Sequence, residues 1–489
     1  MSAAPTTDDL GGRAVRGASA TLAGQGIRIF VLLVSTVVLA RILRPEDFGL
    51  YAVVASLIAF GELFRDFGLS SAASRATKIS RRQKSNLFWI NLLLGIVLGI
   101  IAFLSAGPIA ALFRQPELTG IVEALAVTFP LSGFATQFRA EINRSLRFRA
   151  LAIVDTLPVV FGLASALVYA SFVGADYWVL VVQQIAAVFS GVVLAVIFGR
   201  WFPGLPSRHE SIRSFLNFGL GVFGTQAIAY FTKNADNLAL GFFWGPGPLG
   251  IYSRAYQVLM LPLNQIAAPM TRVAVPVLTR VADQPIRFER YLGQGQLLGG
   301  LGLGLIYGSA LGLADALIPL VFGPGWESMV VVFQILAVGG IFRGLNQVTF
   351  WAFLAKDKTT SQLRFYAWSQ PIIVGLMLAG LPWGPVGVAI GHSIGYFVNW
   401  LLAVGWCARA TGVKAKPLLR QGFLTVAIFV APVSLICFAA TLVMVDYWLQ
   451  VAMAIVGVAA YLLISWKLSA HGRTTMNLVR QGLAHFGRS

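Results

Sequence analysis

The amino-acid sequence predicts an all-α integral membrane protein of about fourteen transmembrane helices, in which two parallel six-helix lobes are followed by two further helices. Three observations predict this fold class: an apolar composition, a series of long hydrophobic runs, and an internal duplication. The chain is 57% hydrophobic and 11% charged, with a mean hydropathy of +0.77. Since a soluble protein carries roughly a quarter charged residues, this chain lacks the polar surface needed to face water on all sides.

The hydrophobic runs have the length that a helix needs to cross a bilayer, roughly twenty residues. In lipid, a segment of this length must satisfy its own backbone hydrogen bonds, which favours helices. The runs lie near residues 22–43, 48–68, 87–106, 118–138, 153–173, 178–199, 216–243, 249–275, 297–321, 329–355, 365–381, 386–407, 423–445 and 448–466. The first run lacks a small-residue cleavage site, so we expect an uncleaved membrane signal.

The basic residues alternate from loop to loop. Twenty-nine of the 37 Lys and Arg residues lie in loops or tails on one side of the predicted bilayer, against three on the other side, Arg41, Arg44 and Arg114. By the positive-inside rule, both termini are predicted to be cytoplasmic. The same spread of basic residues over short loops argues against a nucleic-acid-binding surface, despite the net charge of +18.

The duplication repeats a turn between two hydrophobic runs. Residues 45–51 (PEDFGLY) recur 201 positions later at 246–252 (PGPLGIY), and seven of 27 positions are identical between 25–51 and 226–252. Both copies start on the same side of the membrane, so the repeat is parallel. The predicted parts are a cytoplasmic segment at 1–20, an N-lobe at 21–200, a C-lobe at 213–408, two helices at 420–467 and a cytoplasmic tail at 468–489. That tail is expected to be either an amphipathic surface helix or disordered.

Three stretches resemble the bacterial polysaccharide flippases of the multidrug, oligosaccharidyl-lipid and polysaccharide exporter superfamily. They are residues 39–51 (LARILRPEDFGLY), 64–69 (FRDFGL), and 234–241 (NADNLALG) followed by 249–256 (LGIYSRAY). The resemblance implies a V-shaped bundle of two lobes in the bacterial inner membrane. It also implies a transporter, not an enzyme, that moves polyprenyl-pyrophosphate-linked oligosaccharide from the inner to the outer leaflet for O-antigen, capsule or exopolysaccharide synthesis.

Ionisable residues inside the hydrophobic runs are the candidate site. Such a group costs roughly 2.5 to 3.5 kcal/mol at the bilayer centre on insertion scales, so it normally faces a wet cavity or a partner. Arginine offers phosphate a planar fork of donors and keeps its charge. The predicted substrate-binding cations are Arg28, Lys233, Arg254, Arg343 and, ranked lower because it can reach the cytoplasmic surface, Arg65.

The acidic and neutral candidates have two interpretations each. Glu62 and Asp236 are either ion-pair partners of nearby cations or coupling groups, and His392 is either hydrogen-bonded in a core or carries a coupling proton. Arg28 could pair with Glu62, or Glu62 could instead pair with Arg65 and Asp66 on its own helix. Five amides could bind sugar hydroxyls or pack between helices: Gln25, Gln226, Gln257, Asn264 and Gln265.

Two other function classes stay open. An ion-coupled drug exporter of the same fold would depend on buried carboxylates more than on cations, and a membrane polysaccharide polymerase would need a catalytic outer loop. The longest predicted outer loop, 107–117, is only about a dozen residues. No cofactor and no metal is predicted, and coupling to a proton or sodium is left open. The predicted partners are the lipid-linked oligosaccharide, membrane lipids and other polysaccharide assembly proteins, with no nucleic acid.

Overall fold

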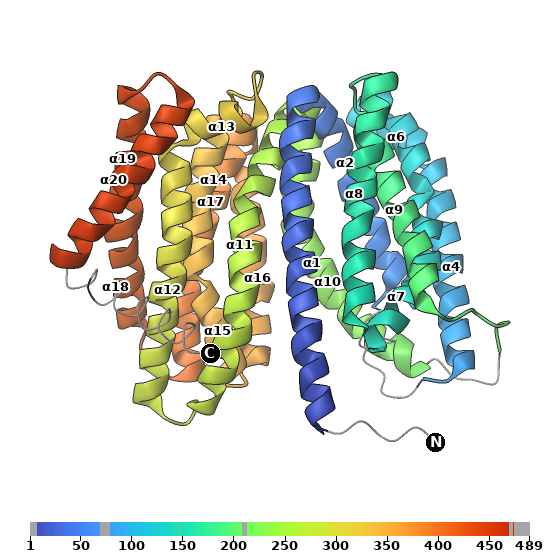
Figure 1. Cartoon of the computed structure of the whole chain (residues 1–489), viewed down its shortest axis with the longest axis horizontal. Helices are drawn as coiled ribbons and strands as arrows, with labels where there is room; N and C mark the ends of the chain where they lie inside the picture. The colour runs from blue at the N-terminus through green and yellow to red at the C-terminus, as the bar shows by residue number, and fades with distance from the viewer. Residues whose placement is uncertain (1–6, 69–78, 146, 208–212, 469–472, 474–489) are drawn as a thin grey trace. The chain divides into compact units, whose positions relative to one another are not determined.

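The computed structural model of the chain describes residues 7–68, 79–145, 147–207, 213–468 and 473. Helices dominate these ranges and no β-strand occurs in them (Figure 1). The chain forms two compact units, which we call unit 1, Met1–Gly250, and unit 2, Ile251–Ser489. The all-helical prediction is therefore confirmed for the described residues.

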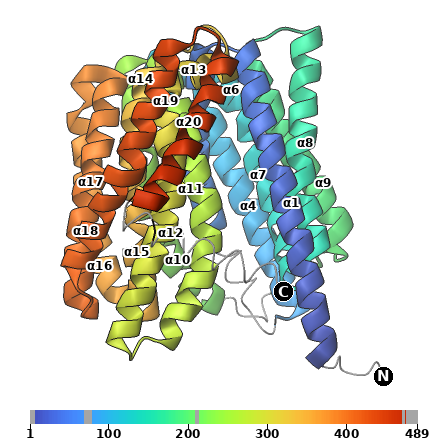
Figure 2. The same ribbon diagram turned by 60° about the vertical axis from the view of Figure 1, so that its left-hand side comes forward.

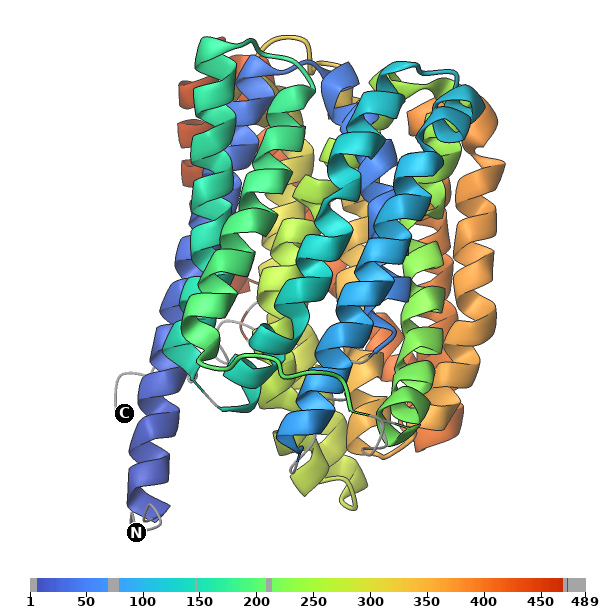
Figure 3. The same cartoon turned by 90° about the vertical axis from the view of Figure 1, so that its right-hand side faces the viewer.

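The described residues of unit 1 form nine helices and the first turn of a tenth. They are α1 (Thr7–Ile42), α2 (Pro45–Asp66), α4 (Arg81–Leu104), α5 (Ala106–Phe113), α6 (Glu117–Ala126), α7 (Thr128–Arg144), α8 (Phe148–Phe172), α9 (Trp178–Gly199), α10 (Arg213–Trp244) and the start of α11 (Pro246–Arg280). Helix α8 packs against α1 and α9, and α7 packs against α9 and α4. Figure 3 shows α8, α9, α7 and α4 side by side, coloured from green to blue.

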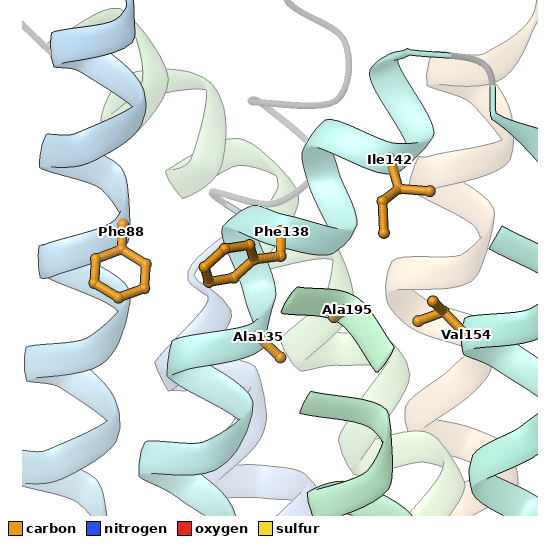
Figure 4. Packing of buried hydrophobic residues seen from close by; sticks show 6 residues of the cluster. All are labelled: Phe88, Ala135, Phe138, Ile142, Val154 and Ala195. Atoms are coloured by element: carbon orange, nitrogen blue, oxygen red, sulfur yellow. The ribbon is translucent and has the colours of Figure 1, made fainter. Parts of the chain in front are cut away.

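Aromatic and small side chains fill the space between α4, α7, α8 and α9. Phe88 and Phe138 are 2% and 1% exposed, and their rings meet edge to face with centroids 6.0 Å apart. Figure 4 shows the two rings facing each other across the α4–α7 interface, with Ile142 and Val154 further along the cluster. The packing of these rings holds α7 in place, and α7 in turn presents polar residues to the cavity described below.

Unit 2 contains the rest of α11 and a second set of helices. They are α12 (Pro285–Gly312), α13 (Ala314–Phe322), α14 (Met329–Leu345), α15 (Gln347–Ala355), α16 (Thr359–Ala379), α17 (Gly384–Thr411), α18 (Ala415–Thr425), α19 (Ala431–Val443) and α20 (Tyr447–Leu468). A π-helical turn, Val426–Val430, joins α18 to α19. Helix α17 packs against α14 and α16, and α12 packs against α14 and α19 (Figure 2).

Eleven helical segments of the described chain are long and apolar enough to cross a membrane, or twelve if the bent pair α12–α13 counts as one span. The chain is therefore a multi-pass membrane protein. Helices α10 and α16 are not among these segments, although fourteen spans were expected. Both contain polar residues that lower their hydropathy, including Lys233 and Asp236 in α10 and Gln362 and Arg364 in α16.

Two details of the predicted spans were wrong. The run 297–321 was expected to be one helix, but α12 and α13 meet at an angle of 82°. Residues 107–117 were expected to form an outer loop, but most of them belong to the short helix α5. The two copies of the repeat share a short helix at this position, since α5 and α13 each follow a long helix after a one-residue break.

The duplicated turn brings two helix starts into close contact within unit 1. A β-carbon added at Gly49 would lie 1.7 Å from the carbonyl oxygen of Pro246, and one added at Gly250 would lie 1.8 Å from that of Pro45. The contact is reciprocal because the two Pro and two Gly residues are equivalent in the repeat. Only glycine allows the backbones of α2 and α11 to approach this closely. The repeated motif therefore has a packing role.

Helix α10 also packs against α2, and this contact explains why α10 belongs to unit 1. The duplication assigns the same helix to the start of the second copy, after residues 200–213. The lobe boundaries remain a prediction from sequence.

Candidate functional site

A cavity of about 630 Å³ lies within unit 1, lined by α1, α2, α7, α8 and α9. It is located where α2 and α7 approach their C-terminal ends and α8 begins. Its polar lining residues are Arg28, Glu62, Arg65, Asp66, Ser132, Thr136, Arg139, Asn143, Asp155 and Gln184. The volume falls within the range of about 300 to 1,000 Å³ that is usual for small-ligand pockets.

An ion pair lies in the wall formed by α2. Nε of Arg65 donates to Oε2 of Glu62 at 2.6 Å, and Nη1 of Arg65 donates to the hydroxyl of Thr136 on α7 at 2.7 Å. The spacing of three residues places both charged groups on one helix face. The side chain of Arg65 is 9% exposed. Arg65 is therefore buried and paired, and it does not extend to the surface as the sequence suggested.

A second ion pair joins α7 to α8 at a more open part of the wall. The guanidinium of Arg139 donates to Oδ1 of Asp155, and the two side chains are 48% and 29% exposed. Sequence analysis missed this pair, because Arg139 was counted among the loop cations and Asp155 was not singled out. The sequence did contain a signal for this pair, because Asp155 is a carboxylate inside the hydrophobic run 153–173.

Arg28 differs from the other two arginines of this cavity. It is exposed on α1, and it has no acidic partner within 4.0 Å among the residues that the structure describes. Glu62 pairs with Arg65 and not with Arg28. A hydrogen bond of 3.2 Å from the hydroxyl of Thr156 to the carbonyl of Gly24 ties this part of α1 to α8.

Arg343 lies in unit 2 among aromatic side chains. Nη1 of Arg343 donates to the hydroxyl of Tyr256 at 3.1 Å, and its guanidinium carbon lies 4.8 Å from the ring centroid of Tyr396. A cation over an aromatic face in a desolvated site is stabilised by roughly 2 kcal/mol. Within the described ranges, no carboxylate lies within ion-pair distance of Arg343.

His392 is completely buried next to the same tyrosines. Its ring centroid lies 4.6 Å from that of Tyr396 and 5.7 Å from that of Tyr256, and it is 0% exposed. Neither ring nitrogen has a hydrogen-bond partner among the described residues. The sequence was compatible with either a hydrogen-bonded histidine or a histidine that carries a coupling proton, and the described residues form no side-chain hydrogen bond with His392.

The remaining candidates lie on α10 and α11. Lys233 is exposed, whereas Asp236 is 3% exposed and accepts a hydrogen bond from the backbone N–H of Asn237. Arg254 donates to Oε1 of Gln257. The structure thus places Arg28, Arg65 and Glu62 on one cavity of unit 1, and Arg343 and His392 in one cluster of unit 2.

No group of three or more His, Cys, Asp or Glu side chains that could hold a metal ion occurs in the described part of the chain.

Comparisons with known proteins agree with the resemblance seen in the sequence. Lipopolysaccharide biosynthesis protein WzxC of Escherichia coli K12 is 27% identical over 423 residues, which cover 84% of this chain and 82% of that protein. Teichuronic acid biosynthesis protein TuaB of Bacillus subtilis 168 is 25% identical over 434 residues, covering 86% and 88%. The fold is similar to that of the lipid II flippase MurJ in an inward closed conformation, with a TM-score of 0.71, 14% identity and coverage of 93% and 99%.

The family described as "Polysaccharide biosynthesis protein" matches residues 38–331, which include the duplicated turn and most of the unit 1 cavity. This match spans more than half of the chain. The chain therefore belongs to this family of polysaccharide biosynthesis proteins.

Proposed function

We propose that this chain is a transporter that flips a polyprenyl-pyrophosphate-linked oligosaccharide from the inner to the outer leaflet of a bacterial cytoplasmic membrane. The family membership supports a role in polysaccharide biosynthesis. Two relatives carry names from lipopolysaccharide and teichuronic acid biosynthesis, and the fold is that of a lipid II flippase. Flipping would supply the precursor of an O-antigen, capsule or exopolysaccharide.

The observation that carries this proposal is the charged cavity within the helices of unit 1. Its wall contains three arginines and three carboxylates in helices that are long and apolar enough to span a membrane. Charged side chains at such positions are costly unless they face a partner or a hydrated cavity. A polar cavity in a membrane-spanning bundle suits a hydrophilic head group whose lipid tail stays in the bilayer.

The finer topology belongs to the proposal. Fourteen spans result if α10, α16 and the bent pair α12–α13 each cross the membrane together with the eleven apolar segments. The alternation of basic loops then supports cytoplasmic termini. In this orientation, the cavity of unit 1 lies in the cytoplasmic half of the helices, on the side from which the substrate would be loaded.

We assign binding of the diphosphate to Arg28, Lys233, Arg254 and Arg343, because arginine and lysine side chains donate hydrogen bonds to phosphate oxygens and arginine keeps its charge. Arg65 ranks below them, since Glu62 already neutralises it. The exposed position of Arg28 and Lys233 supports the assignment of these two most directly.

A deletion strain tests the proposal. We expect loss of the surface polysaccharide together with accumulation of its lipid-linked precursor on the cytoplasmic side, and both should be reversed by the intact gene on a plasmid. Extraction of the lipid fraction and analysis of its sugars by mass spectrometry measure the precursor. Normal polysaccharide combined with increased sensitivity to toxic small molecules would contradict flipping and favour an ion-coupled exporter of the same fold.

A further inference from the structure

Among the residues that the structure describes, the charges that line the cavity of unit 1 balance. Arg28, Arg65 and Arg139 are matched by Glu62, Asp66 and Asp155, and the two pairs described above, Glu62–Arg65 and Arg139–Asp155, account for two residues of each sign. Electrostatically, this is a poor environment for a diphosphate, which carries only negative charge. Carboxylates in the wall repel phosphate, and they accept hydrogen bonds without donating any.

The same wall is well suited to sugar hydroxyls, because each hydroxyl both donates and accepts a hydrogen bond. A guanidinium paired with a carboxylate presents fixed donors next to fixed acceptors. Asn143, Gln184 and Ser132 lie in the same lining, and each of these side chains can both donate and accept hydrogen bonds. The ion pairs hold their side chains in place, so the pattern of donors and acceptors is already formed before a ligand arrives.

We infer that the cavity of unit 1 is a saccharide site, which binds the sugar next to the diphosphate, and that Arg28 marks the side on which the diphosphate lies. Arg28 is the arginine of this lining that has no carboxylate within 4.0 Å among the described residues. This inference rests on the proposed function and assigns one part of its substrate to one part of the protein. None of the five amides that the sequence suggested for sugar binding lines this cavity.

The lining predicts how the sugar is recognised. The described lining contains no aromatic side chain, so its hydrogen bonds rather than stacking on a ring determine the fit. A site built to hydrogen-bond a hydroxyl discriminates strongly against an analogue in which that hydroxyl is missing or displaced. The cavity therefore selects sugars by the positions of their polar groups.

The test uses the full chain in lipid nanodiscs and measures the affinity of polyprenyl diphosphate with and without one sugar. The sugar panel is glucose, galactose, N-acetylglucosamine and glucuronic acid. We expect at least one glycosylated lipid to bind the wild type about tenfold or more tightly than the sugar-free lipid. Asp155→Asn and Arg139→Gln should remove this gain and change the affinity for the sugar-free lipid less than about twofold. Arg28→Gln should weaken binding of all the lipids.

Glu141→Gln is the matched control. Glu141 forms ion pairs with Lys84 and Arg144, each at 2.8 Å, in the same unit but outside the cavity lining. Its loss should leave the preference among sugars unchanged. The melting temperatures of all variants show whether a substitution affects folding. Restoration of the sugar preference by Asp155→Glu shows that the carboxylate itself is needed for recognition.

Three results would overturn the saccharide site: no discrimination by the wild type between sugar-free and glycosylated lipids, equal loss of affinity for both kinds of lipid in Asp155→Asn, or no change in that variant. A wild type that binds none of the lipids, including the sugar-free diphosphate, would instead contradict the proposed function.

Discussion

At the scale of single residues, the charged groups of this protein fall into different environments. Arg65 is neutralised by a carboxylate one turn away, Arg343 is held by a phenol and an aromatic face, and Arg28 has neither kind of partner among the described residues. A buried charge whose partner is removed typically costs 3 to 5 kcal/mol, whereas an exposed one can be replaced without such a cost. The environments therefore predict which substitutions affect folding and which affect transport.

Arg28→Gln should abolish export while the protein still accumulates to its normal level, because no described carboxylate loses its partner. Arg28→Lys should retain part of the export, since lysine keeps the charge but lacks the fork of donors. Glu62→Gln should instead lower the protein level, because it leaves Arg65 unpaired. Immunoblotting of membranes and a surface polysaccharide assay measure the two effects. Restoration of export by combining Arg28→Gln with Glu62→Gln would contradict this assignment, since it would mean that these two residues are partners.

His392→Leu should preserve export, with an unfolding free energy within about 1 kcal/mol of the wild type. The substitution removes two buried ring nitrogens that have no described partner, and this offsets the lost ring contacts. Tyr256→Phe is the comparison, because it removes the hydrogen bond to Arg343 and should cost roughly 1.5 to 3 kcal/mol. Thermal unfolding in detergent measures both. Loss of export in a stable, abundant His392→Leu protein would show that His392 has a coupling role.

At the scale of helices, the repeated Pro-x-x-x-Gly turn determines how closely the first turns of α2 and α11 approach within unit 1. Each glycine faces the carbonyl oxygen of the proline in the other copy. Neither glycine has a positive φ, so the close approach is the reason for glycine at both positions. A similar sequence in two places could reflect two unrelated turns, but here the two copies contact each other.

Gly49→Ala should destabilise the protein by roughly 1 to 3 kcal/mol, the usual cost of overpacking, because its β-carbon would overlap backbone atoms of Pro246 that cannot move independently. Gly405→Ala in α17 is the matched control. No atom lies within 4 Å of a β-carbon at that position, so a helix interior should accept alanine with a small gain. The apparent melting temperature should fall for the first variant only. An unchanged value for Gly49→Ala would contradict the tight crossing.

At the scale of the whole molecule, the sequence predicted helices well and their contacts poorly. Long apolar runs leave the backbone few alternatives in lipid, so the predicted spans correspond to described helices. The bend between α12 and α13 was missed because the run 297–321 is mostly apolar on both sides of it, with Asp315 as its one charged residue. The Arg139–Asp155 pair was missed for another reason, since its partners are 16 residues apart on different helices and only tertiary packing brings them together. The Glu62–Arg65 pair was within reach of sequence analysis because its spacing is local.

The orientation of the whole chain is the last prediction. Cysteines at Ser80 and Ser207 should react only with reagents that enter the cytoplasm. Both positions lie in loops on the side of the predicted bilayer that carries most of the basic residues. A cysteine at Gly247, in the first turn of α11, should react with an impermeant maleimide added to intact cells. The native Cys407 and Cys437 are 1% and 0% exposed, so the wild type is the unlabelled control. Labelling of position 80 from outside would reverse the topology, and with it the cytoplasmic location of the saccharide cavity.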